Sequence, residues 1–173
     1  MGDLLAFAAT RHLLPPVIPG YPLITVGGAV AMNVHGKNQF HTGNFGDHVT
    51  RLTLYHPQRG EVTCGPGENA GVFRLTVGGF GLTGHITSVD IALTSLTGND
   101  IAVERRRVHN LVEAAELMDK LSDASDYIYS WHDLNLRGPK FGSVHGAPLR
   151  AGPRLLIEEV RPFGVEHLAG VSI

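Results

Sequence analysis

Hydrophobic and polar residues alternate along several segments of the chain, and a period of two is typical of strands. The clearest case is 49–56, where Val49, Leu52 and Leu54 stand among polar residues. A turn follows at 57–60, so 61–64 is predicted to be the returning arm of a hairpin. The same pattern predicts further strands over 86–96, 101–108, 126–132 and the later part of 138–149.

Three other segments have the spacing of helices. Residues 3–14 form a short one, with Asp3 as its N-cap and Pro15 and Pro16 ending it. A second is predicted over 68–75. The best is 110–121, because Asn110 caps it and an apolar stripe recurs at helical spacing. The stripe consists of Leu111, Ala114, Ala115, Met118 and Leu121.

The stretch 24–38 carries the most unusual chemistry. Thr25 and Val26 favour a strand, so 23–32 is predicted to be one strand, or two broken at Gly27 and Gly28. A glycine pair costs chain entropy and suggests close approach of the backbone to another group. Residues 35–38 read His-Gly-Lys-Asn, which places an imidazole and an ammonium beside bare backbone. The alternative is a buried strand and turn in which His35 is an ordinary core histidine.

Composition excludes several classes of protein. The chain has 173 residues, 43% of them hydrophobic and 17% charged, which is typical of a globular protein. Its 14 Lys and Arg residues nearly balance its 16 Asp and Glu residues, so no basic field predicts nucleic acid or a membrane surface as a partner. Cys64 is the single cysteine, which fits a reducing, cytoplasmic location. No apolar run approaches membrane-spanning length.

Three motifs suggest a functional site, but the residues around each motif do not support that function. Residues 79–84 match the G-x-G-x-x-G of a dinucleotide-binding loop, but the β-branched alternation that follows does not predict the required helix. His35, His41 and His48 lack the helical spacing of a zinc site. Residues 105–107 are three consecutive arginines. A solvated strand edge is their default interpretation, and contact with an anionic substrate is the alternative.

Several short motifs occur in one order that resembles the vanillyl-alcohol oxidase superfamily of flavoproteins. Within it, the resemblance is strongest to FAD-linked sugar oxidases of the decaprenylphosphoryl-ribose type. It covers 15–93 well, and 98–150 resemble the opening of the family's substrate (cap) domain. The motifs are Pro19-Gly20, Thr25-Val26-Gly27-Gly28-Ala29, His35-Gly36-Lys37-Asn38, Gly43-Asn44-Phe45-Gly46 and the run from Val77 to Ile86.

The resemblance implies a role for each matching residue. Some would follow the phosphates and ribityl chain of FAD, some would lie along its ring, and Ile86 would offer backbone hydrogen bonds. The implied cofactor-binding residues are Gly20, Thr25, Val26, Gly27, Gly28, Met32, Asn33, Val34, His35 and Ile86. His35 would stand by a non-covalently bound flavin and Lys37 would face the substrate, so these two are the implied catalytic residues. No metal is implied.

The predicted fold is α+β. Residues 1–97 would form the C-terminal part of a PCMH-type FAD-binding domain, mainly an antiparallel sheet with flanking helices. Residues 98–173 would begin an α+β cap. The family starts with another FAD-binding half that carries a glycine-rich pyrophosphate loop, and nothing before Gly20 matches it. We therefore expect an internal fragment, with a separate N-terminal half or a homo-oligomer as its partner.

The predicted activity is FAD-dependent oxidation of a secondary alcohol on a sugar or polyol, with a lipid-linked sugar as one version. Two alternatives remain at this point. One is an aldonolactone or alditol oxidase of the same superfamily. The other is a non-catalytic remnant that binds no flavin.

Overall fold

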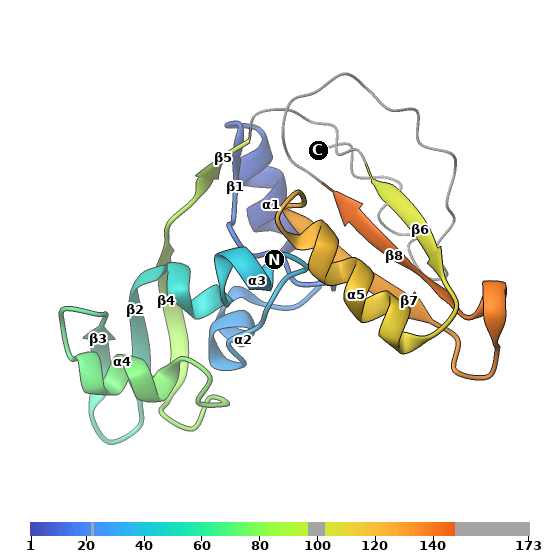
Figure 1. The fold of residues 1–173 in the computed structure, drawn as a ribbon. Helices are drawn as coiled ribbons and strands as arrows, with labels where there is room; N and C mark the ends of the chain where they lie inside the picture. The colour runs from blue at the N-terminus through green and yellow to red at the C-terminus, as the bar shows by residue number, and fades with distance from the viewer. Residues whose placement is uncertain (22, 97–102, 148–173) are drawn as a thin grey trace. The chain divides into compact units, whose positions relative to one another are not determined.

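The chain divides into two compact units, Met1–Leu96 and Thr97–Ile173. The structure is a computed structural model that describes residues 1–21, 23–96 and 103–147. The division after Leu96 lies one residue before the predicted boundary after residue 97. Each unit combines antiparallel strands with helices, and the predicted α+β class is confirmed (Figure 1). The expected continuation of the cap over 151–173 lies outside the described residues.

The first unit is built on a three-stranded antiparallel sheet in the order β3-β2-β4. Its strands are β2 (Val49–His56), β3 (Gly60–Cys64) and β4 (His85–Ile91). The predicted hairpin is confirmed, with Leu52 paired to Cys64 and His56 to Gly60. Alternation along β2 buries Leu52 and Leu54 in the core while Tyr55 stays exposed, as a one-sided sheet requires.

Shorter elements surround this sheet. They are α1 (Gly2–Ala9), β1 (Leu13–Leu14), α3 (Gln39–Thr42), η1 (Phe45–His48), α4 (Ala70–Thr76) and β5 (Thr94–Ser95). The helix predicted over 3–14 ends early, because His12 adopts a positive φ of 54° and Leu13–Leu14 pairs with β5. Met1, rather than Asp3, is its N-cap. The glycine-containing segment 38–48, which has no strand or helix pattern in the sequence, contains two helical turns, α3 and η1.

The strand predicted over 23–32 is wrong, because this segment forms helix α2 (Val26–Ala31). Thr25 is its N-cap: the backbone N–H of Gly28 donates to Thr25 Oγ1 at 2.9 Å. Ala29 and Val30 are fully buried against the sheet core. Burial of these small residues outweighs the β preference of Thr25 and Val26, which is a weak signal in any short segment.

The second unit is a three-stranded antiparallel sheet in the order β6-β8-β7, with one helix on one face (Figure 1). Its elements are β6 (Glu104–Val108), α5 (Leu111–Ser122), β7 (Tyr127–His132), η2 (Gly138–Lys140) and β8 (Gly142–Ala147). Ala114, Leu117, Met118 and Leu121 of α5 pack on Val108, Ile128 and Val144 of the strands. The predicted helix is confirmed, but Leu111 and Ala115 face away from this core and are exposed.

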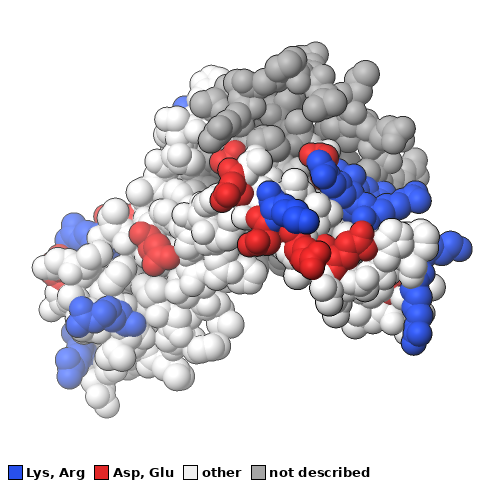
Figure 2. Space-filling view, viewed as in Figure 1, with Lys and Arg blue, Asp and Glu red and all other residues white. Residues whose placement is uncertain are grey.

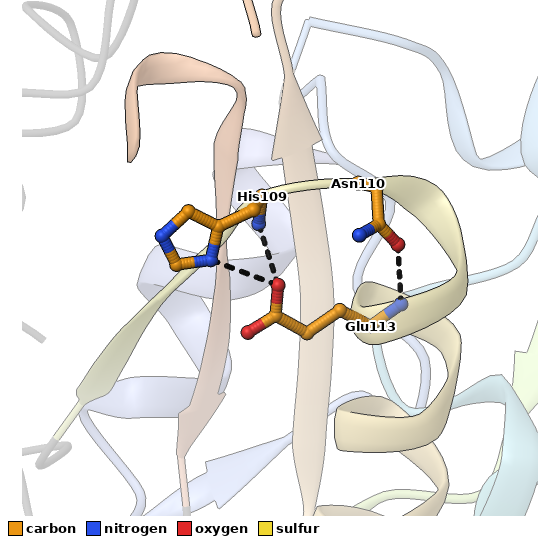
Figure 3. A network of polar contacts seen from close by, with 3 residues as sticks. All are labelled: His109, Asn110 and Glu113. Carbon is orange, nitrogen blue, oxygen red and sulfur yellow. Dashed lines mark hydrogen bonds and ion pairs between the residues drawn. The ribbon is translucent and has the colours of Figure 1, made fainter. Parts of the chain in front are cut away.

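The start of α5 is fixed by a small polar network (Figure 3). The backbone N–H of Glu113 donates to Asn110 Oδ1 at 2.9 Å, which confirms Asn110 as the cap. In return, Glu113 Oε2 accepts from the backbone N–H of His109 at 2.8 Å and lies 2.9 Å from His109 Nδ1. The backbone hydrogen bond is the main reason why the pKa of Glu113 is lowered. These contacts occupy N–H groups that the helix itself leaves without partners.

We expect Asn110→Ala to destabilise α5 by about 1 kcal/mol, because the cap acceptor is lost. Amide hydrogen exchange along α5 in the whole chain should then be roughly fivefold faster. Asn110→Ser keeps a cap oxygen and is the matched control, with exchange near the parental rate. Equal exchange in the alanine and serine variants would show that the cap contributes nothing.

Candidate functional site

Helix α2 ends in a tight reversal at Asn33. Asn33 has a left-handed φ of 44°, a region that asparagine tolerates better than most residues. The N–H of Asn33 donates to Val30 O at 3.0 Å, and that of Val34 donates to Ala29 O at 3.1 Å. This is the Schellman pattern of a helix C-terminus, with asparagine in place of the usual glycine. It turns the chain sharply from the helix toward His35.

Two other segments meet this reversal. Asn33 Oδ1 accepts a hydrogen bond from the backbone N–H of buried Gly46 at 2.9 Å. From the other side, Gly78 N–H donates to Val30 O at 3.0 Å and Phe80 N–H donates to Ala31 O at 2.9 Å. The turn at 77–80 thus gives Val30 O a second donor, besides the N–H of Asn33, and gives Ala31 O a donor at the end of α2. Phe80 itself has a positive φ of 56° and a 69% exposed side chain.

The N-terminal end of α2 lies against strand β4. A Cβ placed on Gly27 would lie 3.5 Å from Cβ of Ile86, so the space between helix and strand at this point would admit only a methyl group. At Gly28 a Cβ would come within 3.0 Å of Thr25 Oγ1 and crowd the cap. Two groups of predicted cofactor residues, Thr25 to Gly28 and Ile86, are therefore brought together. Gly20 is exposed, and no atom lies within 4 Å of its Cβ position.

The His-Gly-Lys-Asn corner is held from behind by Asn38. Its Nδ2 donates to Pro16 O at 2.7 Å and to Thr42 Oγ1 at 3.1 Å, and the residue is buried. A Cβ on Gly36 would lie 2.9 Å from Ile18 O, a backbone atom that cannot move aside, so only glycine fits there. In this motif, the structural residues Gly36 and Asn38 therefore alternate with two residues that face outward, His35 and Lys37.

The outward residues are His35 and Lys37, both exposed. His35 forms a β-bridge with Asn44, and its Nδ1 lies 3.3 Å from Gly36 O. The alternative interpretation, in which His35 is an ordinary core histidine, is therefore wrong. Partial desolvation by neighbouring protein atoms lowers the pKa of Lys37. A histidine and a lysine fixed by a rigid backbone could orient a bound ring and donate to a polar ligand.

The residues of the first unit fit one side of a binding site for a flavin dinucleotide. The first N–H groups of a helix favour phosphate oxygens, and Gly27 and Gly28 keep side chains away from them. Met32, with a 54% exposed side chain, lies between those groups and His35 in the sequence and offers apolar surface to a flat ring. The loop at 79–84 leads into strand β4 rather than a helix, so it lacks the context of a Rossmann loop.

Residues 1–65 match the sequence model of a family described as FAD binding domain. This part of the chain is therefore similar to an FAD-binding domain, and the match indicates FAD as the cofactor, as the motifs predicted. The fold resembles that of 6-hydroxy-D-nicotine oxidase from Arthrobacter nicotinovorans, with a TM-score of 0.64 and 22% identity over 87% of this chain and 34% of that one. At this identity the likeness shows the fold alone.

Two curated relatives cover most of the chain. It is 37% identical over 145 residues to decaprenylphosphoryl-beta-D-ribose oxidase of Mycolicibacterium smegmatis, a match that covers 81% of this chain and 31% of the relative. A protein of Streptomyces coelicolor, described as uncharacterized and encoded in the mprA 5′ region, is 31% identical over 130 residues, covering 73% and 34%. The first of these matches, together with the FAD-binding domain model, confirms the resemblance to FAD-linked oxidases. The chain spans about a third of the length of these relatives.

Two further findings concern the described residues. Within 1–21, 23–96 and 103–147, no three His, Cys, Asp or Glu side chains come together so that they could hold a metal ion. In the same part of the chain, no helix has both the length and the apolar character needed to cross a bilayer.

The sequence missed the residues that shape the site from behind. The resemblance implies that Asn33 binds the flavin, and the structure adds a structural role, because Asn33 Oδ1 accepts from the backbone N–H of Gly46. Gly46 must be glycine, since a Cβ there would collide with Val77 and with Asn33. One signal could have revealed this arrangement: Thr25 and Asn33 bracket a short apolar run as an N-cap and a left-handed C-terminal residue would.

We expect Asn33→Ala to destabilise the first unit by about 2 kcal/mol, because it leaves the buried Gly46 N–H without an acceptor and puts alanine at a positive φ. Denaturant unfolding of the chain and exchange of the Gly46 amide would both report the loss. Asn33→Asp keeps the acceptor and tolerates the same φ, so it is the matched control. If alanine and aspartate variants unfold alike, Asn33 does not hold the reversal.

Proposed function

We propose that residues 1–173 form part of an FAD-dependent oxidoreductase that oxidises a secondary alcohol of a sugar or polyol. The observation that carries this proposal is the 37% identity, over 81% of the chain, to an oxidase named for a lipid-linked ribose. The outward-facing His35 and Lys37 support it, because their exposed positions leave them accessible to a ligand.

The first unit would bind one side of the cofactor. Backbone N–H groups of Val26 and Gly27 at the start of α2 would contact phosphate oxygens, while Thr25 keeps the Gly28 N–H for its own cap. Ile86 lies beside Gly27 and would offer its backbone to the same ligand. When bound, the flavin supplies the hydride acceptor. The protein groups bind and orient it.

His35 and Lys37 would serve different partners. His35 follows directly after the reversal at Asn33, so its position is fixed by the end of α2, and it would lie beside the flavin ring. Lys37 carries a compact charge on a flexible stem, which suits a substrate hydroxyl or phosphate better than a planar carboxylate. Its lowered pKa reflects a partly desolvated ammonium, and a desolvated donor binds polar ligands more strongly.

We further propose that the second unit begins the substrate-binding, or cap, domain of such an oxidase. Its sheet, with one helix on a single face, is a separate compact unit that follows the flavin-binding residues in the chain. A separate N-terminal FAD-binding half, or a second copy of this chain, is the proposed protein partner. The second candidate function is the alternative that the sequence left open, a remnant that binds no flavin.

In protein loaded with FAD, we expect His35→Ala to slow flavin reduction by a sugar substrate by about tenfold or more, through misplacement of the reacting groups. Its unfolding should change little, because His35 is exposed. Lys37→Met is the contrasting variant: it should raise KM or lower the rate while FAD stays bound. Stopped-flow flavin absorbance separates the two. Parental reduction rates in His35→Ala would remove it from the flavin face.

We expect residues 1–173 alone to bind FAD weakly or not at all, because a dinucleotide gains affinity only when most of its surface is enclosed. Exposed Leu23, Met32 and Phe80 also favour association with another chain. Flavin fluorescence during titration measures binding, with and without a polypeptide that supplies the family's other FAD-binding half. Rescue by that half supports the oxidase, and its failure favours the remnant. Stoichiometric, low-micromolar binding by a stable monomer would contradict the expectation.

A further inference from the structure

The sheet of the second unit has two chemically different faces. Helix α5 covers one face and buries Val108, Ile128 and Val144 against it. Successive residues of a strand point to opposite faces, so the neighbours of these valines and isoleucine share the face that α5 does not cover. That face, here called the polar face, carries Arg105, Arg107, Tyr129, Trp131, Ser143 and His145.

The strand register arranges the polar face in two rows. Arg105 of β6 pairs with His145 of β8, which pairs with Tyr129 of β7. In the next row Arg107 pairs with Ser143, and Ser143 pairs with Trp131. Directly paired residues on one face have Cβ atoms about 5 Å apart. Each row therefore runs from a guanidinium at the sheet edge, through a polar centre, to an aromatic ring.

The centre of the polar face is rigid. Ser143 and His145 are 3% and 5% exposed, and Ser143 Oγ lies 2.9 Å from His145 Nε2. The Tyr129 ring stacks on His145 with centroids 4.6 Å apart and planes 13° apart. Buried polar groups cost free energy that apolar residues would avoid, and this sheet already has its apolar core on the other face. Stability alone does not explain why these residues are polar.

The arginines on the two faces differ in their partners. Arg106 points to the α5 face and forms an ion pair with Glu104, with Nη2 and Oε1 2.6 Å apart. Among the described residues, neither Arg105 nor Arg107 has an ion pair or a hydrogen-bonding side-chain partner, and both are exposed. Burial raises the pKa of Tyr129, and the charge of Arg105 opposes that shift. Figure 2 shows this unit from the side of α5, with blue side chains along β6 and red ones over α5, and the polar face is turned away from the viewer.

We propose that the polar face binds the phosphate group of a small phosphorylated ligand through Arg105 and Arg107. The two arginines are two residues apart on one strand, which separates their Cα atoms by about 7 Å, a span that two guanidinium groups can bridge around one phosphate. His145 and Ser143 form the rigid centre beside them. A phosphorylated sugar is the ligand that the proposed function would supply, and that identification rests on it. The phosphate site itself lies wholly in the second unit and needs no flavin.

Trp131 allows a direct test, because it is the single tryptophan of the chain and lies in the same row as Arg107. Ribose 5-phosphate, ribose and inorganic phosphate are titrated into the whole chain without FAD, at constant ionic strength, and Trp131 fluorescence is followed. We expect a saturable change with ribose 5-phosphate and none with ribose. Inorganic phosphate that binds as tightly would identify free phosphate as a ligand and still support the site.

Variants decide which arginines carry the binding. Arg105→Gln and Arg107→Gln should each weaken binding of ribose 5-phosphate by about tenfold or more, as the loss of a charge-assisted hydrogen bond does. Arg106→Gln is the matched control, with the same charge change on the opposite face, and should bind as the parent does. Far-ultraviolet circular dichroism checks that all three fold. Equal losses in all three, or no saturable response in the parent, would overturn the proposal, whatever the outcome of the FAD titration.

Discussion

The reversal of the chain at Asn33 is the constraint on which the first unit depends. A six-residue helix cannot sustain itself in water, so α2 needs partners at both ends. Thr25 caps one end, and the other end is held by the Schellman hydrogen bonds, by Gly46 and by the turn at 77–80. Three segments distant in sequence therefore meet at one left-handed residue. If that residue could not adopt a positive φ, all three would lose their common partner.

This constraint sets the distance between the two parts of the candidate site. A helix rises 1.5 Å per residue, so the six residues of α2 separate its first N–H groups from the reversal by about 9 Å. The glycine pair stands at one end of that span and His35 just beyond the other. Because every polar contact that fixes α2 is made by the protein itself, the spacing exists before any ligand binds. Ligand binding then orders few additional groups, which favours affinity.

Elements with long, regular patterns were predictable from sequence, and short ones were not. Strand β2 and helix α5 follow directly from alternation and from the Asn110 cap, because each packs one face on a hydrophobic core. The segment 23–32 was misassigned since its apolar run is too short to distinguish period two from period 3.6. Its caps, Thr25 and Asn33, carried the information that the β preference of Thr25 and Val26 concealed.

The composition of the polar face of the second unit was even harder to predict from the sequence. Three arginines in a row are visible in the sequence, and contact with an anion was one interpretation of them. Alternation along the strand divides them between two faces, but the residues that lie opposite each arginine depend on register with β8, some forty residues further along the chain, and no local pattern encodes that pairing. Once the register is known, Arg106 is neutralised by Glu104, whereas Arg105 and Arg107 flank a buried histidine and serine. Identical neighbouring residues thus differ in chemistry through strand alternation, through the local pair with Glu104 and through long-range strand pairing, which is why the charge of the segment in isolation could not reveal a ligand.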